Sequence, residues 1–475
     1  MTAAASTTSS PAGADTPDLS PLWASVQRTH GWQPQRIEGT LPEALKTTVI
    51  RTGPGLIERF GRRLPHSFEA DGVMMALRLA GDGSAQGAVR IVESPGYRAE
   101  QAAGKPLFGA LAPWWRRFLN GLRQRTKATG NTSMMHWQGR VYALMEGARP
   151  VQVQIDPHDL STGDTSDLGG VVGATFSAHP HRLDQTRTTI NFGVTYGPKP
   201  SLTLYALPDQ GPARQLGVVP LPWNTMVHDF AVTERYAVFL VCPLMFSLGR
   251  ALLAPRGFRG LFRWTPSAGA QVLVVPLDDV EHPITASLPA RFVFHLANAQ
   301  QRGDALLVDW VQYTNADVVT ALAGDGAPPK VDPSTLQRVE IDLNTGAVRA
   351  DAPLWDRGCD FPVLPAPRVG QRYDTLWLMA AGDDQSRGIV RLEPETGTVN
   401  AWTPGPGIRA SEPLFVPHPD ARRDDEGWLV SLVLDGWRGE SFFGIFDADR
   451  PSDGPLCRVW MGQALPTTFH GTLVP

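Results

Sequence analysis

The feature that most constrains the fold is a set of short, strand-like runs separated by turn residues. These runs are rich in Val, Thr, Phe, Trp and Leu, which are typical of strands. The 475-residue chain also contains 47 Gly and 42 Pro, as expected for many short elements joined by turns. The pattern predicts an all-β fold. The clearest runs are 201–207, 236–241, 271–277, 305–313, 375–380 and 427–434.

Two segments repeat one hairpin pattern. Val339–Arg349 and Val390–Trp402 each read as a strand, a Thr-Gly turn and a second strand, with the turns at Thr345 and Thr396. The turns are 51 residues apart, close to the repeat of about 40–50 residues that β-propeller blades show. Two copies favour a propeller without proving one.

The rest of the chain predicts one large domain. Residues 1–20 are small, polar and interrupted by Pro, which is typical of a disordered tail. No second low-complexity linker follows, so residues 21–475 are expected to form a single domain. The longest apolar run, 237–246, is much shorter than the roughly 20 residues that span a bilayer.

The charge balance and the cysteine content limit which binding partners and which cellular compartment we expect for this protein. The 43 Lys and Arg nearly balance the 47 Asp and Glu, which argues against a broad basic surface for nucleic acid. The three cysteines have neither disulfide-scaffold nor zinc-finger spacing, so free thiols in a reducing compartment are expected. The N-terminus lacks a basic region followed by an apolar core. We therefore expect a cytoplasmic protein, with peripheral contact at the inner membrane face left open.

Two apolar segments carry interleaved arginines. Pro113–Arg125 has Trp, Phe and Leu at helical spacing after a first-turn proline. Pro243–Trp264 contains four arginines in an otherwise apolar stretch. Each segment is interpreted either as a helix packed on the sheet or as a surface that enters a lipid interface while Arg reaches the headgroups.

Four of the eleven histidines share an apolar or small-residue setting. They are His179 (FSAHPH), His228 (MVHDFAV), His295 (FVFHLANA) and His470 (TTFHGT). Their spacing matches no local metal motif. In a circular fold, however, strands from different blades converge on one axis, and neutral imidazoles suit Fe, Zn, Cu or Ni. Separate, hydrogen-bonded core histidines are the alternative.

From about Gly39 to the C-terminus the chain resembles the carotenoid cleavage oxygenase family. The resemblance implies a seven-bladed β-propeller with a small helical cap over the axis, and iron on that axis. It rests on eight ordered segments that include all four histidine motifs. They are 51–77, 130–150 (with ALMEG), 176–193, 226–239, 294–304, 359–374 (CDFP), 411–430 (SEPLF) and 469–472.

By this resemblance the four histidines bind one Fe(II) ion and leave positions open for O2. Carboxylates are expected to orient the imidazoles through their second ring nitrogen and to soften the buried charge. The resemblance pairs Glu146 with His228, Asp360 with His295, and Glu412 with His470.

Two further positions follow from the resemblance. Asp360 stands where the family usually has Glu, and it is one methylene shorter, so direct contact with His295 would require a backbone shift or a bridging water. Thr132 matches a residue beside the open coordination position, where its methyl group would limit solvent access. The alternative for Thr132 is an ordinary turn or strand hydroxyl. His181, two residues after His179, is expected to be structural or to support a ligand.

The implied reaction inserts O2 across one C=C bond of a carotenoid or apocarotenoid and gives two carbonyl products. An apolar polyene is the expected substrate, and segment 244–264 the expected membrane contact at the tunnel mouth. A lignostilbene- or phenylpropanoid-cleaving dioxygenase is one alternative, but that branch tends to carry Lys where this chain has Met145. A polyene isomerase or binding protein that does not oxygenate is another.

Overall fold

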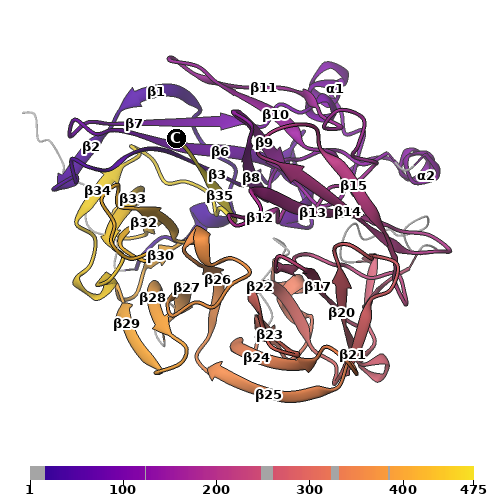
Figure 1. The fold of residues 1–475 in the computed structure, drawn as a ribbon. Helices are drawn as coiled ribbons and strands as arrows, with labels where there is room; N and C mark the ends of the chain where they lie inside the picture. Colours follow the sequence, from indigo (N-terminus) through magenta and orange to yellow (C-terminus); the bar gives the residue numbers. More distant parts are fainter. Residues whose placement is uncertain (1–15, 124, 248–259, 323–330, 383–385) are drawn as a thin grey trace, which may run out of the picture.

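The computed structural model describes all residues except 1–15, 124, 248–259, 323–330 and 383–385. Several antiparallel sheets lie around a common centre (Figure 1). All six predicted strand runs are strands, and the two predicted hairpins are confirmed as β24–β25 (Thr335–Asp342, Val348–Trp355) and β28–β29 (Arg387–Glu393, Thr398–Trp402). Gly346 and Gly397 close the two turns with φ of 72° and 73°, a conformation that glycine adopts without a Cβ clash.

The first sheet joins the two ends of the chain. Strand β3 pairs with β35, and its register runs from Thr48 opposite Val474 to Arg51 opposite Gly471. The sheet order is β1 (His30–Pro34), β7 (Ala85–Ile91), β6 (Asp71–Ala80), β3 (Lys46–Leu56) and β35 (Gly471–Val474).

Four four-stranded sheets follow along the chain. The second is β11 (Leu160–Thr165), β10 (Val151–Ile155), β9 (Arg140–Leu144) and β8 (Ser133–Trp137), and the third is β12 (His181–Leu183), β13 (Thr188–Thr195), β14 (Ser201–Pro208) and β15 (Arg214–Pro220). The fourth is β16 (Ala231–Val232), β17 (Tyr236–Val241), β20 (Ala270–Pro276) and β21 (Ile284–Leu288), and the fifth is β22 (Phe292–Arg302), β23 (Ala305–Tyr313), β24 and β25.

A ten-stranded sheet completes the set. Its two halves meet where β28 and β30 form one parallel pair, Arg387 opposite Arg409. The first half is β26 (Cys359–Val363), β27 (Leu376–Ala381), β28 and β29. The second half is β30 (Ile408–Ala410), β31 (Leu414–Pro417), β32 (Gly427–Asp435), β33 (Glu440–Asp447), β34 (Cys457–Trp460) and β2 (Arg36–Gly39).

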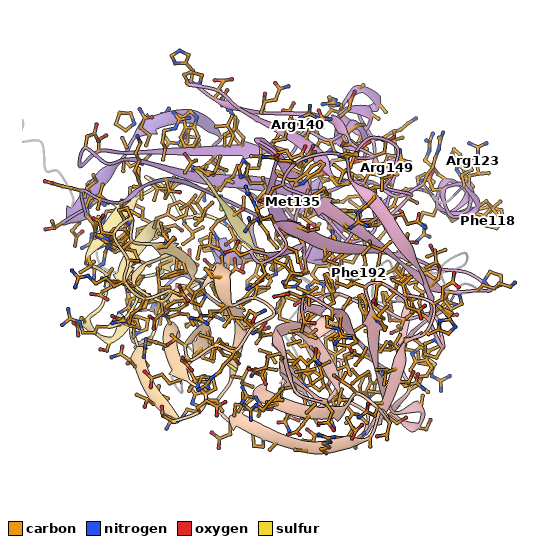
Figure 2. All side chains as sticks on the ribbon, viewed as in Figure 1. Phe118, Arg123, Met135, Arg140, Arg149 and Phe192 are labelled. Atoms are coloured by element: carbon orange, nitrogen blue, oxygen red, sulfur yellow. The ribbon has the colours of Figure 1, made fainter. Side chains whose placement is uncertain are left out.

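Buried apolar clusters join each sheet to the next. Phe192 of β13, labelled in Figure 2, packs edge to face on Phe239 of β17 across the third and fourth sheets, with the ring centroids 5.1 Å apart. One cluster joins the first sheet to the second, and another joins the second to the third. A further cluster joins the fourth sheet to the fifth and also includes residues of β26–β28. The halves of the ten-stranded sheet share a cluster, and its last strands pack on the first sheet.

Few helices accompany the sheets in the described chain. They are α1 (Pro95–Ala103), α2 (Trp114–Leu122) and α4 (Asp317–Ala321), with 3-10 turns η1 (Ser20–Trp23), η2 (Ser67–Glu69), η4 (Pro266–Ala268), η5 (Ala366–Arg368) and η6 (Pro451–Asp453). Among the described residues there are also two short hairpins, β4–β5 (Glu58–Arg59, Arg62–Arg63) and β18–β19 (Leu244–Phe246, Phe262–Trp264).

The two predicted helical segments differ in outcome. Helix α2 confirms the helix in 113–125, but none of its residues is buried, and Phe118 projects outward from it at the periphery (Figure 2). A helix over 243–264 is wrong at both described ends, which form the β18–β19 hairpin, because side chains there alternate across strands. Its middle, 248–259, lies outside the described residues.

Two further predictions were a disordered N-terminal tail over residues 1–20 and the absence of a membrane-spanning segment. Residues 1–15 of the tail lie outside the described residues, and the Asp18 N–H donates to the Gly436 carbonyl at 2.8 Å. None of the described helices has the length and apolar character that a membrane span requires.

Candidate metal centre

The structure brings the four predicted histidines together at the centre of the sheets. Their ligand nitrogens lie within 4.8 Å of one another, and all four side chains are buried. The Nε2 atoms of His179 and His228 are 3.0 Å apart, and those of His295 and His470 are 3.1 Å apart. Positions that span most of the chain therefore converge on one point.

The topology explains this convergence. His179, His228 and His470 come just before β12, β16 and β35, and His295 lies within β22. Each of these strands is an edge strand of its sheet. Edge strands that all face one centre place their side chains in a common space, which no local sequence spacing would reveal.

Three carboxylates bond the second nitrogen of three of the imidazoles. Glu146 Oε1 contacts His228 Nδ1, Asp360 Oδ1 lies 2.6 Å from His295 Nδ1, and Glu412 Oε1 lies 2.7 Å from His470 Nδ1. A carboxylate that accepts from Nδ1–H fixes the tautomer and leaves Nε2 unprotonated toward the centre. These are the three pairs expected from the sequence.

Burial and neighbouring charges set the protonation of the site. Burial, followed by the three neighbouring imidazoles, holds the pKa of His179 well below its usual value. Burial also lowers the pKa of His470, although Glu412 opposes it. At His295 burial is outweighed by Asp360, and the pKa is raised. Neutral imidazoles are the form that binds metal, so the donor set of four buried nitrogens fits a transition metal that favours imidazole.

A family comparison agrees with this site. The model of the retinal pigment epithelial membrane protein family matches residues 23–475. The chain belongs to this family. Its relatives include the apocarotenoid-15,15'-oxygenase of Synechocystis, 31% identical over 457 residues and covering 92% of each chain. The isoeugenol monooxygenase of Pseudomonas nitroreducens is 25% identical and covers 92% of this chain and 94% of its own.

The structural neighbours agree with the sequence relatives. The cobalt-substituted Synechocystis apocarotenoid oxygenase aligns with a TM-score of 0.86 at 28% identity, covering 95% of this chain and 97% of that chain. A chimera of that oxygenase with RPE65 also aligns with a TM-score of 0.86. The family fold thus extends over nearly the whole molecule.

Within this family scaffold, Asp360 reaches His295 directly. Its strand β26 breaks register between Asp360 and Val363, and Phe361 has a φ of 54°. The shorter Asp360 side chain thus bonds His295 directly, and the backbone beside it is irregular. The Tyr313 hydroxyl donates to the other carboxylate oxygen at 2.6 Å. The sequence analysis missed Tyr313, which lies 47 residues from its partner.

His179 has a different carboxylate neighbour from the other three histidines. Its Nδ1 is 3.7 Å from Asp229 Oδ1, which His181 Nε2 contacts at 2.8 Å. Backbone N–H groups of Phe230 and Leu296 also donate to Asp229. The sequence analysis missed Asp229, and its position directly after His228 was the available signal. His181 thus lies beside the site and contacts a carboxylate rather than the cluster.

Arg51 bonds both Glu412 and the segment that leads to His470. The fully buried guanidinium donates to the carbonyls of Glu412 and Phe469 at 2.8 and 2.9 Å, to Thr468 Oγ1 at 3.2 Å, and to Glu412 Oε2 at 3.4 Å. Burial raises the pKa of Glu412, but His470 and Arg51 outweigh it and the net pKa is lowered. Arg51 was also missed, because only the fold brings it to residues 412–470.

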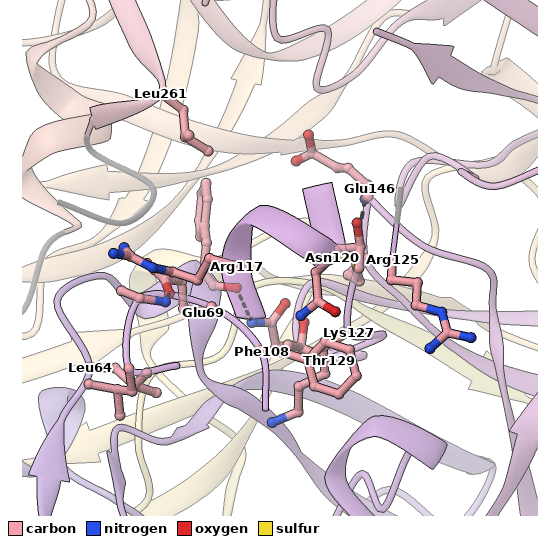
Figure 3. Close-up of a pocket in the computed structure, with 18 of the residues that line it drawn as sticks. Leu64, Glu69, Phe108, Arg117, Asn120, Arg125, Lys127, Thr129, Glu146 and Leu261 are labelled. Carbon is pink, nitrogen blue, oxygen red and sulfur yellow. Dashed lines mark hydrogen bonds between the residues drawn. The ribbon is translucent and has the colours of Figure 1, made fainter. Parts of the chain in front are cut away.

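Two cavities adjoin near the histidine cluster, and the second of them reaches it. The first, of about 400 Å³, is lined by Glu146 and by α2 residues that include Arg117 and Asn120 (Figure 3). The second, of about 450 Å³, is lined by His228, His295 and His470 among others. Both cavities include Phe68 and Thr132 in their walls, so Thr132 lies where they adjoin.

Proposed function

We propose that this chain is an Fe(II)-dependent dioxygenase that cleaves one C=C bond of an apocarotenoid or carotenoid. The observation that carries the proposal is the buried four-histidine cluster, three members of which line the second of two adjoining cavities. A chain-like substrate that passes from one cavity to the other presents an internal double bond to the cluster. One O2 molecule and one C=C bond give two C=O groups, which accounts for every atom. The apocarotenoid and carotenoid cleavage enzymes among the relatives support this substrate class.

The residues of the chain prepare the site for this reaction. A bound iron ion supplies the activation of O2. His179, His228, His295 and His470 would hold it, and Glu146, Asp360 and Glu412 keep three of the imidazoles oriented. The surrounding apolar side chains exclude bulk water and fix which double bond lies beside the cluster. Thr132, at the junction of the cavities, narrows the access of solvent.

A phenylpropanoid substrate is the second candidate. The isoeugenol monooxygenases among the relatives favour it. Met145, in the wall of the first cavity, offers a phenolate no charge, so the long apolar substrate remains the preferred one. A protein that isomerises or binds a polyene without oxygenating it is the third candidate. The assay described below distinguishes it from the other two.

We further propose that residues 21–475 form one seven-bladed propeller with a small helical cap. Division of the ten-stranded sheet at its single parallel pair leaves seven groups of four or more strands in the described chain, besides two short hairpins. The apolar clusters that join successive groups and return to the first sheet support closure.

The mouth of the first cavity is proposed to contact a membrane from the cytoplasmic side. Helix α2 exposes 73% of Trp114 and 61% of Leu122, and other α2 residues line the cavity. Phe246 and Phe262, from the described ends of segment 244–264, line it too. An apolar rim with nearby arginines suits an interface that stores an apolar substrate.

The test is a parallel assay of the iron-loaded protein with an apocarotenal and a hydroxystilbene under isotopically labelled O2. Labelled aldehydes from the apocarotenal are expected. Aldehydes from the stilbene alone select the second candidate, and an altered polyene without O2 consumption selects the third. His470→Ala should lose iron, and normal iron content in that variant would overturn the ligand assignment.

A further inference from the structure

One buried carboxylate beside the histidine cluster is bonded by groups from three segments of the chain. Asp229 directly follows His228 and is 5% exposed. Its Oδ1 accepts from the Phe230 N–H at 2.7 Å and lies 2.8 Å from His181 Nε2, and its Oδ2 accepts from the Leu296 N–H at 2.8 Å. Both oxygens of this carboxylate are therefore occupied.

Each of the three segments contributes one histidine to the cluster. The segments are 179–181, 228–230 and 295–296, and their histidines are His179, His228 and His295. The segments lead into β12 and β16 or lie within β22, and these strands belong to the third, fourth and fifth sheets. The single side chain of Asp229 thus connects the ligand-bearing segments of three successive sheets.

The bond to Leu296 coincides with an irregular stretch of β22. The register of β22 with β23 shifts between Val293 and Leu296, so His295 stands within the irregular stretch. A local irregularity of this kind changes the direction of a side chain. Because β22 is an edge strand, it presents backbone groups that its own sheet leaves unpaired, and Asp229 accepts from one of them.

The same carboxylate is close to the fourth imidazole in charge terms as well. His179 has no hydrogen-bonded carboxylate among the described residues, and its Nδ1 lies 3.7 Å from Asp229 Oδ1. This distance is too long for a hydrogen bond, but a charge acts strongly over it in a buried site. Asp229 therefore adds negative charge beside the one imidazole that the other three carboxylates do not contact.

We propose that Asp229 is a positioning residue of the metal centre, which fixes three ligand-bearing segments relative to one another. The three carboxylates that bond single imidazoles cannot do this. The inference rests on the proposed binding of a metal ion by the four histidines, and not on the reaction. Asp229→Asn tests it, because an amide has one acceptor oxygen where the carboxylate has two. At least one of the three donors then loses its partner, while the size of the side chain is unchanged.

The assay is titration of the metal-free protein with Co(II) against a competing chelator, with the visible absorption of the bound ion as a second readout. Asp229→Asn should raise the Kd for Co(II) about tenfold to a hundredfold, the range for residues that orient metal ligands, and should shift the absorption bands because the ligand geometry changes. Asp309→Asn is the matched control, since Asp309 is 1% exposed and accepts from Arg338 and Tyr373. Both variants should lower the free energy of unfolding, but Asp309→Asn should leave the Kd and the spectrum unchanged.

Two variants of His181 keep the test decisive if Asp229→Asn fails to fold. His181→Leu removes one donor and should raise the Kd by up to about tenfold, whereas His181→Gln retains a donor and should restore most of the affinity. Wild-type affinity in Asp229→Asn, or in His181→Leu where the first variant does not fold, overturns the proposal, and so does an equal loss in Asp309→Asn. A wild type that binds no Co(II) overturns the metal centre itself, whereas normal binding without oxygenation refutes only the proposed reaction.

Discussion

Arg51→Met tests whether a buried cation stabilises the position of His470 and of its partner Glu412. The substitution keeps most of the side-chain volume but removes the donor to two carbonyls, one hydroxyl and the Glu412 carboxylate. Arg51 is 0% exposed and the Glu412 side chain 9% exposed, so the variant leaves a buried carboxylate with less compensation. Removal of one partner from such a pair destabilises a protein by about 3–5 kcal/mol.

The assay is urea unfolding of the metal-free protein, followed by Trp fluorescence. Arg51→Met should lower the free energy of unfolding by about 3–5 kcal/mol. The double variant with Glu412→Gln should be more stable than Arg51→Met alone, because the uncompensated carboxylate is then absent. Arg90→Met, which breaks a partly exposed pair with Asp159, should have a much smaller effect. A loss of less than about 1 kcal/mol for Arg51→Met, the range of exposed pairs, would refute the reasoning.

Three other predictions concern the metal and the membrane. Tyr313→Phe removes the donor to Asp360 and should weaken metal binding about tenfold in a competition titration; unchanged affinity would contradict this role. Trp114→Asp with Leu122→Asp should reduce co-sedimentation with lipid vesicles, whereas Trp437→Asp, at another exposed site, should not. Metal content after gel filtration should fall as the pH drops, beginning with the protonation of His295, because Asp360 raises its pKa above the ordinary value of about 6.5 while burial lowers the pKa values of His179 and His470; metal content unchanged down to about pH 5 would count against histidine as the metal-binding group.

The sequence predicts the strands well because their signal is local. Val, Thr and aromatic residues between turns mark the six runs and both Thr-Gly hairpins, and each of these needs information from only a few neighbouring residues. The pairing of β3 with β35 has no such signal, since it joins the two ends of the chain. The helix predicted over 243–264 was wrong at its ends for a related reason, because a continuous apolar run does not distinguish helix from strand.

The same distinction between local and long-range information applies to the residues of the site. The four histidines and three carboxylates stand within motifs that resemble a family, so residue identity was enough to select them. Arg51, Asp229 and Tyr313 were missed because their importance lies in contacts over long separations, such as the 417 residues between Arg51 and Thr468. A buried polar side chain acquires its role from the partners that the fold provides.

The pairing of β3 with β35 and the assembly of the histidine cluster depend on the same segment. His470 immediately precedes β35, which pairs with β3, and the His470 N–H donates to the Thr132 carbonyl at 3.0 Å. The segment from His470 through β35 thus places His470 in the cluster, contacts Thr132 and completes the first sheet. Arg51 sits opposite Gly471 in that pairing while its guanidinium holds Glu412. The carboxylate that contacts His470 is therefore held by a side chain of β3, the strand with which β35 pairs, so the pairing of these two strands and the placement of His470 are linked.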